Sequence, residues 1–185
     1  MQAPISFRPL ARSDFPLLQQ WLSASHVDGW WHERLDLAGV EAKYAPRIDG
    51  AEPTHVFILQ HAGRPVGWIQ WYLWSDYPEH ALQLNTGPAS AGIDLAIGEY
   101  DMTGLGLGPA AVREFIRQIV FADACIAAVI TDPQEGNLRS LRAFEKAGFA
   151  RTNTVRLVGE DFRRRVVRLD GSLMEDTCQT PTSAW

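Results

Sequence analysis

The densest group of residues that could do chemistry lies between positions 92 and 108, in the segment GIDLAIGEYDMTGLGLG. Asp94 interrupts an apolar run, and Gly104, Gly106 and Gly108 stand at alternate positions before an amphipathic helix. An acid of this kind beside a cleft is a candidate general base. The first amides of a helix have no intrahelical acceptor and carry partial positive charge, so a glycine-rich backbone there can wrap a phosphate. The alternative is a tight turn that needs glycine only for positive φ.

The spacing of these glycines excludes two common nucleotide-binding motifs. A dinucleotide fold requires G-x-G-x-x-G after an early strand, with an acid roughly 20 positions later. Here the glycines follow G-x-G-x-G and lie in the middle of the chain. A Walker loop would end in Gly-Lys-Ser/Thr, and this segment does not.

The elements that must position this segment follow from hydrophobic periodicity and turn residues. The first half predicts a strand at 5–10, a helix capped by Ser13 and running to about Ser25, a loop and helix ending near Pro46, and a hairpin over 54–74. The second half predicts a long loop at 75–91, a strand at 92–97, a helix at 109–121, a buried strand at 125–130 that includes Cys125, a helix at 138–147 stopped by Gly148, and a strand pair at 152–159 and 164–169. The order predicts an α/β (α+β) fold with helices packed on a sheet.

Composition narrows the class of protein. The 185 residues predict one domain over 1–170 and a C-terminal tail over 171–185. A formal net charge of −5 argues against nucleic acid or an anionic membrane as partner, because both require a concentrated positive surface. No signal-peptide pattern or spanning apolar run is visible, so a cytoplasmic protein is expected. The five histidines and two cysteines show no metal-ligand spacing, so no metal is expected.

Two motifs resemble the GNAT acetyltransferase superfamily. TGLGLG is similar to the Q/R-x-x-G-x-G/A turn that binds the pyrophosphate of acetyl-CoA, with Thr103 in place of Gln or Arg. NLRSLRAFEKAGF is similar to the superfamily's late helix, which ends in aromatic-x-x-x-G-F/Y. The succession SHVDGWW, GWIQWY, GIDLAIG, GLGLG and TDPQEGNLRSLRAFEKAGF further resembles the aminoglycoside 6′-N-acetyltransferases, over about residues 5–170.

This resemblance implies a GNAT fold, in which a mixed central sheet flanked by helices has a splayed strand pair that binds acetyl-CoA. It implies that the backbone of the glycine turn holds the phosphates, that Asn137 touches the pantetheine arm, and that Phe144 occupies a position where the subfamily has tyrosine. A phenyl ring cannot donate a proton to the leaving thiolate. The expected cofactor-binding residues are Leu95, Ala96, Ile97, Thr103, Gly104, Leu105, Gly106, Leu107, Gly108, Asn137 and Phe144.

Asp94 is the expected catalytic residue. The acceptor amine is mostly protonated at neutral pH, with lysine at about 10.4 as a guide, so a nearby carboxylate can anchor the ammonium and receive its proton. Backbone amides around Leu95 and Ala96 are expected to donate to the developing oxyanion. The alternative is that Asp94 only points to solvent from one face of the sheet.

The acceptor pocket should combine carboxylates for ammonium groups with aromatic rings for sugars. Asp132, and Glu160 or Asp161, match acids that the resembling family has in its pocket. For the tryptophans, ordinary core packing is the alternative, and RRR at 163–165 is expected to point to solvent. The expected substrate-binding residues are Trp30, Trp31, Gln70, Tyr72, Asp94, Asp132, Glu160 and Asp161.

The resemblance therefore implies an acetyl-CoA-dependent N-acetyltransferase, monomeric or homodimeric, that acts on the 6′-amine of aminoglycosides and confers resistance. One alternative is an acyltransferase of the same fold acting on a lysine-type amine in siderophore synthesis; three or more carboxylates in the pocket would favour the antibiotic. The other is a non-catalytic acyl-CoA-binding sensor, suggested by Phe144 and by Thr103.

Overall fold

The computed structural model describes residues 4–33 and 35–172. Its strands form one sheet in the order β1-β2-β3-β4-β5-β7-β6. Every neighbouring pair is antiparallel except β4 and β5, which are parallel. The strands are β1 (Ile5–Pro9), β2 (His55–His61), β3 (Arg64–Leu73), β4 (Ser90–Ile97), β5 (Ala128–Thr131), β6 (Ala150–Val155) and β7 (Arg164–Asp170).

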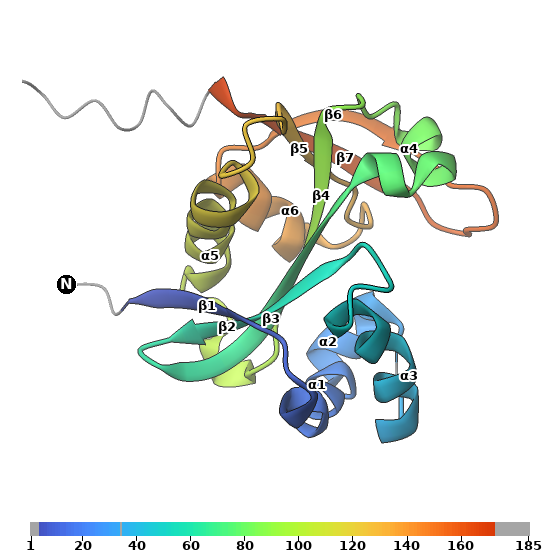
Figure 1. The fold of residues 1–185 in the computed structure, drawn as a ribbon. Helices are drawn as coiled ribbons and strands as arrows, with labels where there is room; N and C mark the ends of the chain where they lie inside the picture. Colours follow the sequence, from blue (N-terminus) through green and yellow to red (C-terminus); the bar gives the residue numbers. More distant parts are fainter. Residues whose placement is uncertain (1–3, 34, 173–185) are drawn as a thin grey trace, which may run out of the picture.

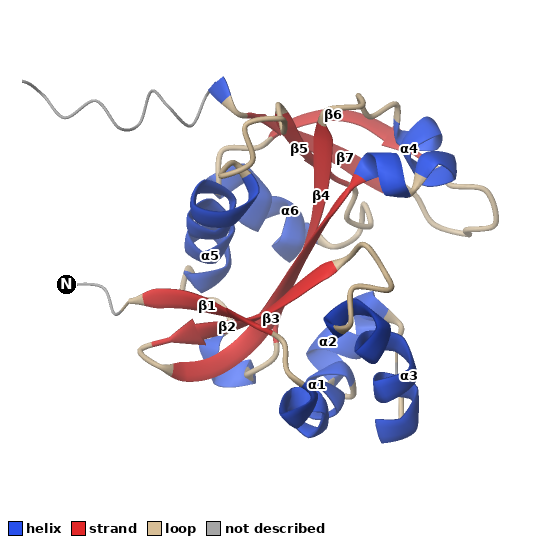
Figure 2. Cartoon of the chain, in the orientation of Figure 1, coloured by secondary structure: helices blue, strands red, loops and turns tan. Residues whose placement is uncertain are grey.

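Helices cover both faces of this sheet (Figures 1 and 2). In Figure 1, α5 and α6 lie on one side, whereas α1, α2 and α3 lie on the other side at the lower end, with α4 above them. The α-helices are α1 (Phe15–Leu22), α2 (Ser25–Trp31), α3 (Leu37–Ile48), α4 (Pro78–Leu84), α5 (Leu107–Phe115) and α6 (Leu138–Lys146). The short 3-10 helices are η1 (Arg12–Asp14), η2 (Trp74–Asp76) and η3 (Tyr100–Met102), and η4 (Ile116–Val120) is a π-helical turn.

The parallel strands β4 and β5 separate soon after they meet. Their pairing consists of Ser90 with Ala128 and Ala91 with Val129, although β4 continues to Ile97. Beyond Ala91, β4 is paired only with β3, so its other edge is open. Backbone groups on such an edge still need hydrogen-bond partners.

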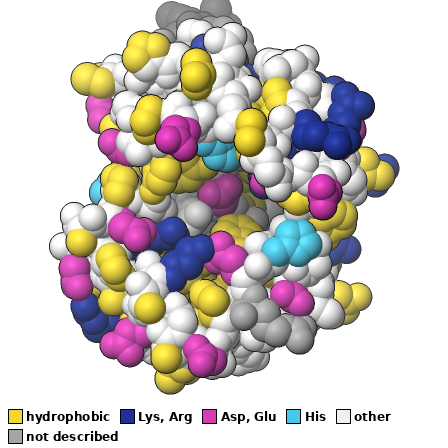
Figure 3. Space-filling view, turned by 90° about the vertical axis from the view of Figure 1, so that its right-hand side faces the viewer, with side chains coloured by type: hydrophobic (Ala, Val, Ile, Leu, Met, Phe, Trp, Pro, Cys, Tyr) yellow, Lys and Arg dark blue, Asp and Glu magenta, His cyan; other side chains and the backbone are white. Residues whose placement is uncertain are grey.

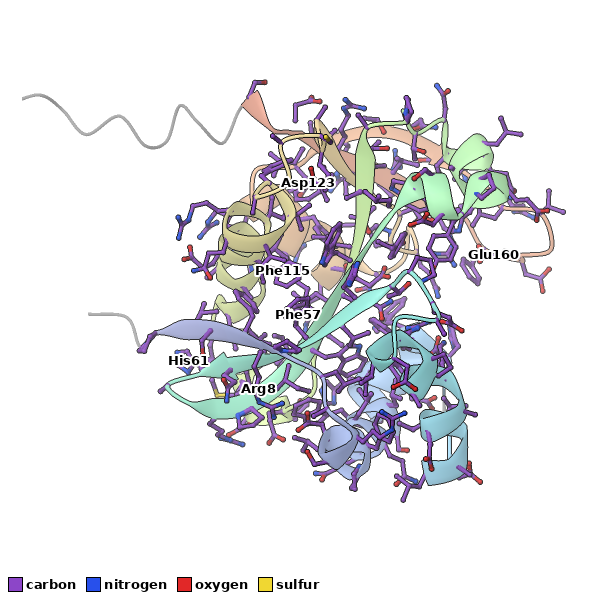
Figure 4. The ribbon with its side chains drawn as sticks, viewed as in Figure 1. Arg8, Phe57, His61, Phe115, Asp123 and Glu160 are labelled. Atoms are coloured by element: carbon purple, nitrogen blue, oxygen red, sulfur yellow. The ribbon has the colours of Figure 1, made fainter. Side chains whose placement is uncertain are left out.

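Two main cores hold the sheet between its helices. On the α5 and α6 face, Phe57 and Phe115 point toward each other and meet edge to face at 5.3 Å (Figure 4). On the α1–α3 face, Trp21 stacks on Trp68 with ring centroids 6.1 Å apart. Long β3 and β4 contribute side chains to both cores, which fixes their alternation.

Three predictions about the N-terminal helices are wrong in detail. The chain makes two helices between residues 15 and 31, and Ser13 lies in η1 instead of capping a helix. Helix α3 runs through Pro46 to Ile48. Proline removes one amide donor, and so close to the end of a helix this costs little of the hydrogen-bond ladder.

Further differences lie in the second half of the chain. The predicted loop over 75–91 contains α4, which has Pro78 in its first turn, where the missing N–H costs nothing. The predicted helix 109–121 begins instead at Leu107, inside the glycine segment, and changes to a π-helical turn at Ile116. Cys125 was expected in a buried strand, but it is exposed in the turn before β5.

The hairpin over 54–74 forms as predicted. The late strand pair also forms, but β6 begins at Ala150 and ends at Val155, whereas the sequence predicts the strand over 152–159. The proposed tail begins where Gly171 donates its backbone N–H to Ala127, and residues 173–185 lie outside the described residues. In the described part of the chain, no helix has the length and apolar character needed to cross a membrane.

Candidate active site

Asp94 faces Gln70 across two neighbouring strands. The β3–β4 register places the two residues directly opposite each other, and Gln70 Nε2 donates to Asp94 Oδ2 at 2.9 Å. Arg47 Nη1, from α3, donates to Gln70 Oε1 at 3.1 Å. Strand alternation puts both side chains on the face covered by α1–α3. Asp94 therefore belongs to a built polar site and does not simply point to solvent.

Burial changes the acidity of Asp94. Desolvation raises the pKa of this carboxyl to about 6; the hydrogen bond from Gln70 opposes the shift, and the charge of Asp132 adds to it. The carboxylate is therefore still ionised at neutral pH and is more basic than an ordinary aspartate.

Tyr72 is seated by Gly92, its partner across the strands. A Cβ at Gly92 would lie 2.3 Å from Tyr72 Cε2, so the ring occupies the space of the missing side chain. The β3–β4 register is continuous from Gly67 to Leu73, so Gly92 produces no bulge at Asp94. Burial raises the pKa of Tyr72 well above its usual value, which keeps the phenol protonated.

A cleft opens over this face of β3, between the α3 and α4 parts of the molecule. Figure 3 shows it as a hollow with acidic, basic and histidine side chains around it. Tyr77 and Thr54, from its two sides, share a hydrogen bond of 2.6 Å. The cleft is lined by Arg47, Thr54, Gln70, Tyr72, Trp74, Tyr77 and His80.

Arg47, Thr54, Tyr77 and His80 were not among the predicted site residues. Two sequence signals could have found some of them. Pro78, followed by an acid and a histidine, is a helix start within the long loop, and its helix carries His80. Arg47 follows Pro46 directly. Extending the predicted helix past Pro46 would have placed Arg47 on it and made it a candidate for the site.

Asp132 lies at the end of β5 and is buried, with 5% of its surface exposed. His80 Nε2 is 3.0 Å from its Oδ2, and Arg164 Nη1 is 3.5 Å from the same oxygen. Arg164 also binds Glu160 through Nε at 2.7 Å and Nη2 at 2.5 Å. Glu160 belongs to the loop between β6 and β7, beside α4 (Figure 4). Asp161, the other candidate acid, is exposed.

The expectation that the RRR segment points to solvent is therefore wrong for Arg164. Arg163 and Arg165 both pair with Glu135, whereas Arg164, between them, turns toward Asp132. This is the alternation of a strand, which sends successive side chains to opposite faces. Burial lowers the pKa of Arg164, but the hydrogen bonds that it donates to Glu160 and the charge of Asp132 outweigh this effect, so the pKa is raised and the group stays protonated.

The two predicted tryptophans have different environments. Trp30 is 43% exposed, and its ring lies 3.9 Å from where a Cβ of Gly136 would be, in the loop after β5. Gln134, in the same loop, donates to the backbone oxygen of Trp30. Trp31 packs edge to face on Trp68 at 4.8 Å, in the α1–α3 core. Trp30 thus remains available to a ligand, and Trp31 has a packing role.

The glycine segment forms an open turn at the start of α5. Gly104 and Gly106 have φ of 77° and 79°, and a Cβ added at either would meet nothing within 4 Å. Gly106 is the N-cap of α5, and Gly108 lies within the helix. The turn therefore uses glycine for positive φ and also presents bare backbone to solvent at a helix N-terminus, which is the geometry that phosphate binding requires. Thr103 donates its hydroxyl to Tyr100 O at 2.8 Å.

The open edge of β4 leads toward this turn. Gly98, just beyond the end of β4, donates its N–H to Val66 O in β3. Alternation therefore directs the N–H of Ala96 toward β3 and the N–H groups of Leu95 and Ile97 toward the open edge. Of the two expected oxyanion donors, Leu95 is the one that faces the gap. His26 Nε2 donates to Ile97 O at 3.0 Å, which fixes the tautomer of His26.

Two predicted cofactor residues have structural roles. Asn137 is the N-cap of α6, and its Oδ1 accepts from Ser140 N at 3.1 Å. Phe144 is 5% exposed and packs edge to face on Phe149 at 5.1 Å in the core. Little of its ring can therefore touch a ligand. No cluster of three or more His, Cys, Asp or Glu that could hold a metal occurs among the described residues.

The open edge of β4 and the bare turn before α5 fit acetyl-CoA. Amides along a strand edge can pair with the amides of a pantetheine arm, and a helix N-terminus suits a pyrophosphate. The residues that would hold it are Leu95 and Ile97 on the edge and 103–108 in the turn.

Comparisons with known proteins agree with this geometry. Residues 11–157 match the acetyltransferase (GNAT) domain family. Aminoglycoside N(6′)-acetyltransferase type 1 of Klebsiella pneumoniae is 32% identical over 154 residues, which cover 82% of this chain and 76% of that protein. The crystal structure of aminoglycoside acetyltransferase AAC(6′)-Ib with coenzyme A and kanamycin has a TM-score of 0.86 at 30% identity, covering 95% of this chain and 100% of that one. A complex of the same enzyme with coenzyme A alone gives the same TM-score of 0.86. The predicted superfamily and fold class are confirmed, and the chain belongs to the GNAT acetyltransferase family.

Proposed function

We propose that this protein transfers the acetyl group of acetyl-CoA to the 6′-amino group of aminoglycosides, and so confers resistance to them. The observation that carries the proposal is the position of Asp94, an acid with a pKa of about 6. It lies between the open edge of β4 and the cleft, whose lining residue His80 contacts a further acid, Asp132. The AAC(6′)-Ib enzyme compared above forms complexes with coenzyme A and kanamycin, and it shares this fold over nearly the whole chain.

Asp94 acts on the acceptor. Its carboxylate binds the incoming ammonium group and takes up the proton that the amine must lose before attack, directly or through water. A pKa of about 6 leaves the group ionised at the pH of the cell and makes it a better proton acceptor than an ordinary aspartate. Gln70 occupies one oxygen, Oδ2, and leaves the other for the amine.

The backbone positions the acetyl donor. When bound, acetyl-CoA supplies an activated acetyl group as a thioester. The amides of the turn at 103–108 would hold its phosphates, and the N–H of Leu95 would hold the carbonyl oxygen that gains negative charge. Phe144 has no proton to donate to the sulfur of coenzyme A. The sulfur therefore leaves as a thiolate or is protonated by water. A thiol with a pKa near ~8.5 makes this feasible.

The acids near the cleft outnumber the arginine that binds two of them, and the remaining negative charge favours an amino sugar over the siderophore-type acceptor. Asp94, Asp132 and Glu160 come from three different elements and meet around one site. The polar lining, with Arg47, Gln70 and His80, does not suit a long apolar acyl chain. Because the reaction consumes acetyl-CoA, the proposal places the protein in the cytoplasm.

The test is to mix the purified protein with acetyl-CoA and kanamycin or tobramycin and to follow thiol release. The acetylated nitrogen of the product is then located by NMR. Release with a 6′-acetylated product is expected. Acetylation only of a lysine-type amine would select the siderophore enzyme. Tight acetyl-CoA binding without turnover on any amine would select the sensor.

A further inference from the structure

Two of the acids expected to bind ammonium groups are already bound to a cation of the protein. Arg164 makes a two-pronged contact with Glu160, at 2.7 and 2.5 Å. It also donates to the backbone oxygen of Asp132 at 3.2 Å and lies 3.5 Å from that residue's carboxylate. Such forked arginine–carboxylate contacts are stronger than ordinary hydrogen bonds and have a fixed geometry.

These groups are largely removed from solvent. The side chain of Asp132 is 6% exposed, and those of Arg164 and Glu160 are each 23% exposed. Burial at this level protects the pair from salt screening and makes it costly to separate. His80 occupies the remaining approach to Asp132 Oδ2, at 3.0 Å.

Asp94 differs from these acids. In the described part of the chain its hydrogen bond comes from the neutral amide of Gln70, and no cation lies within ion-pair distance. Other charges near the cleft are matched: Glu33 pairs with Lys43, and Arg47 pairs with Glu52 at 3.1 Å. Among the described residues, the site therefore presents the unpaired carboxylate of Asp94 and an acid cluster, Asp132–Arg164–Glu160, in which one guanidinium offsets one of the two negative charges.

We infer that Arg164 is a specificity-determining residue, which offsets one of the two negative charges at the Asp132–Glu160 end of the cleft. The site then favours an amino sugar with its reacting ammonium on Asp94 and with neutral hydroxyl groups, in preference to further ammonium groups, at the Arg164 end. An extra ammonium there would be repelled by the guanidinium and would find both acids already in contact with it. The inference rests on the proposed function insofar as Asp94 holds the reacting amine.

The experiment uses acceptors that differ by one amine. Kanamycin B carries an amine where kanamycin A has a hydroxyl, so the ratio of their kcat/KM values (B over A) reports the cost of the extra charge. Replacing Arg164→Met should raise this ratio by about 10-fold, mainly through the KM for kanamycin B. Arg164→Lys keeps the charge and should leave the ratio within about 2-fold. An unchanged or lower ratio in Arg164→Met would overturn the inference.

A second variant separates this role from structural damage. Glu160→Gln removes one acid but leaves Arg164, so the ratio should fall, opposite in direction to Arg164→Met. Damage to the fold would lower kcat/KM for both acceptors by the same factor and would leave their ratio unchanged in both variants. That result would also overturn the inference.

Matched simple amines keep this test independent of the proposed function. The binding of 1,4-diaminobutane and of 4-aminobutan-1-ol is measured by calorimetry in the presence of coenzyme A, for the wild type and for both variants. If no kanamycin is acetylated, the proposed function fails. The Kd ratio of the amine pair still supports the role of Arg164 if it shifts in opposite directions in the two variants, and refutes it if it does not.

Discussion

Gln70 donates to Asp94, and the direction of that hydrogen bond is set by a third residue. Arg47 can only donate, so the oxygen of the Gln70 amide must face it, and the NH₂ group is left to face the carboxylate at 2.9 Å. The Arg47 side chain is only 12% exposed and is held on its other side by Glu52. Asp94 is thus kept in one rotamer by a chain of contacts that starts on α3.

Replacing Asp94 by asparagine should abolish most turnover and leave acetyl-CoA binding intact. The amide keeps the size of the side chain but cannot take up a proton, and such general bases contribute about 10²–10⁴-fold to rate. Thiol release would measure kcat, and calorimetry would measure acetyl-CoA affinity. Turnover within a few-fold of the wild type would remove Asp94 from the mechanism.

The same variant should be more stable than the wild type at neutral pH. The folded-state pKa of about 6 lies above the ordinary aspartate value of 3.8, so the folded protein holds this proton more tightly than the unfolded chain does. Stability contributed by the group is present below pH 4 and is lost as the pH rises through 6. The difference between these two pKa values corresponds to a loss of up to about 3 kcal/mol in the free energy of unfolding at pH 8.

Thermal unfolding of both proteins at pH 8 and pH 4 checks this. Asp94→Asn should melt higher than the wild type at pH 8, and the gap should close toward pH 4. Equal melting temperatures at pH 8 would show that burial does not penalise the charge of Asp94.

Replacing Arg47 by methionine should shift the acidic limb of the pH–rate profile. Without Arg47 the Gln70 amide is no longer fixed, and the hydrogen bond that lowers the pKa of Asp94 is weakened. The midpoint of kcat/KM should move to higher pH, and kcat at pH 6 should fall more than kcat at pH 8.

The matched control for this experiment is Glu52→Gln. It removes the ion pair between Arg47 and Glu52 but keeps the hydrogen bond from Arg47 to Gln70. The midpoint of the pH–rate profile should therefore not change. A purely structural role for Arg47 would lower kcat equally at all pH values, and that result would contradict the positioning role.

Gly92→Ala tests how Tyr72 is seated. The new methyl group would lie 2.3 Å from the ring, which must therefore move within the cleft. The KM for the acceptor should rise several-fold, whereas acetyl-CoA affinity should change little. Gly87→Ala is the control, because a Cβ there meets nothing within 4 Å. Steady-state kinetics with both variants measures the KM values. Identical KM values would exclude a role for the Gly92–Tyr72 contact in binding the acceptor.

Local signals explain which parts of the fold could be predicted. The hairpin around Gly63 and the helix that starts in the glycine segment depend on neighbouring residues, and the sequence carries them directly. The position of Asp94 also follows from alternation along one strand. Helix α4 is not predicted because its seven residues are too few to show a clear helical period.

The acid cluster shows the limit of such reasoning. Asp132 and Glu160 were expected from the resemblance, but their partners were not, because His80 is 52 residues from Asp132 and Arg164 is 32 residues from it. The Arg164 contact exists because β7 inserts between β5 and β6, a strand order that periodicity alone does not reveal, and the His80 contact depends on α4. The sequence therefore overestimates the negative charge that a ligand meets at Asp132 and Glu160, because it does not reveal that Arg164 lies between them.

The early parting of β4 and β5 has a consequence for amide hydrogen exchange. The middle of a sheet is usually the slowest region to exchange, because each N–H there is held by a neighbouring strand. In this protein the N–H groups of Leu95 and Ile97 face the gap, so in the free protein they should exchange with deuterium quickly, at the centre of the molecule. Protection of these two amides on adding coenzyme A would mean that the small molecule serves as the missing strand.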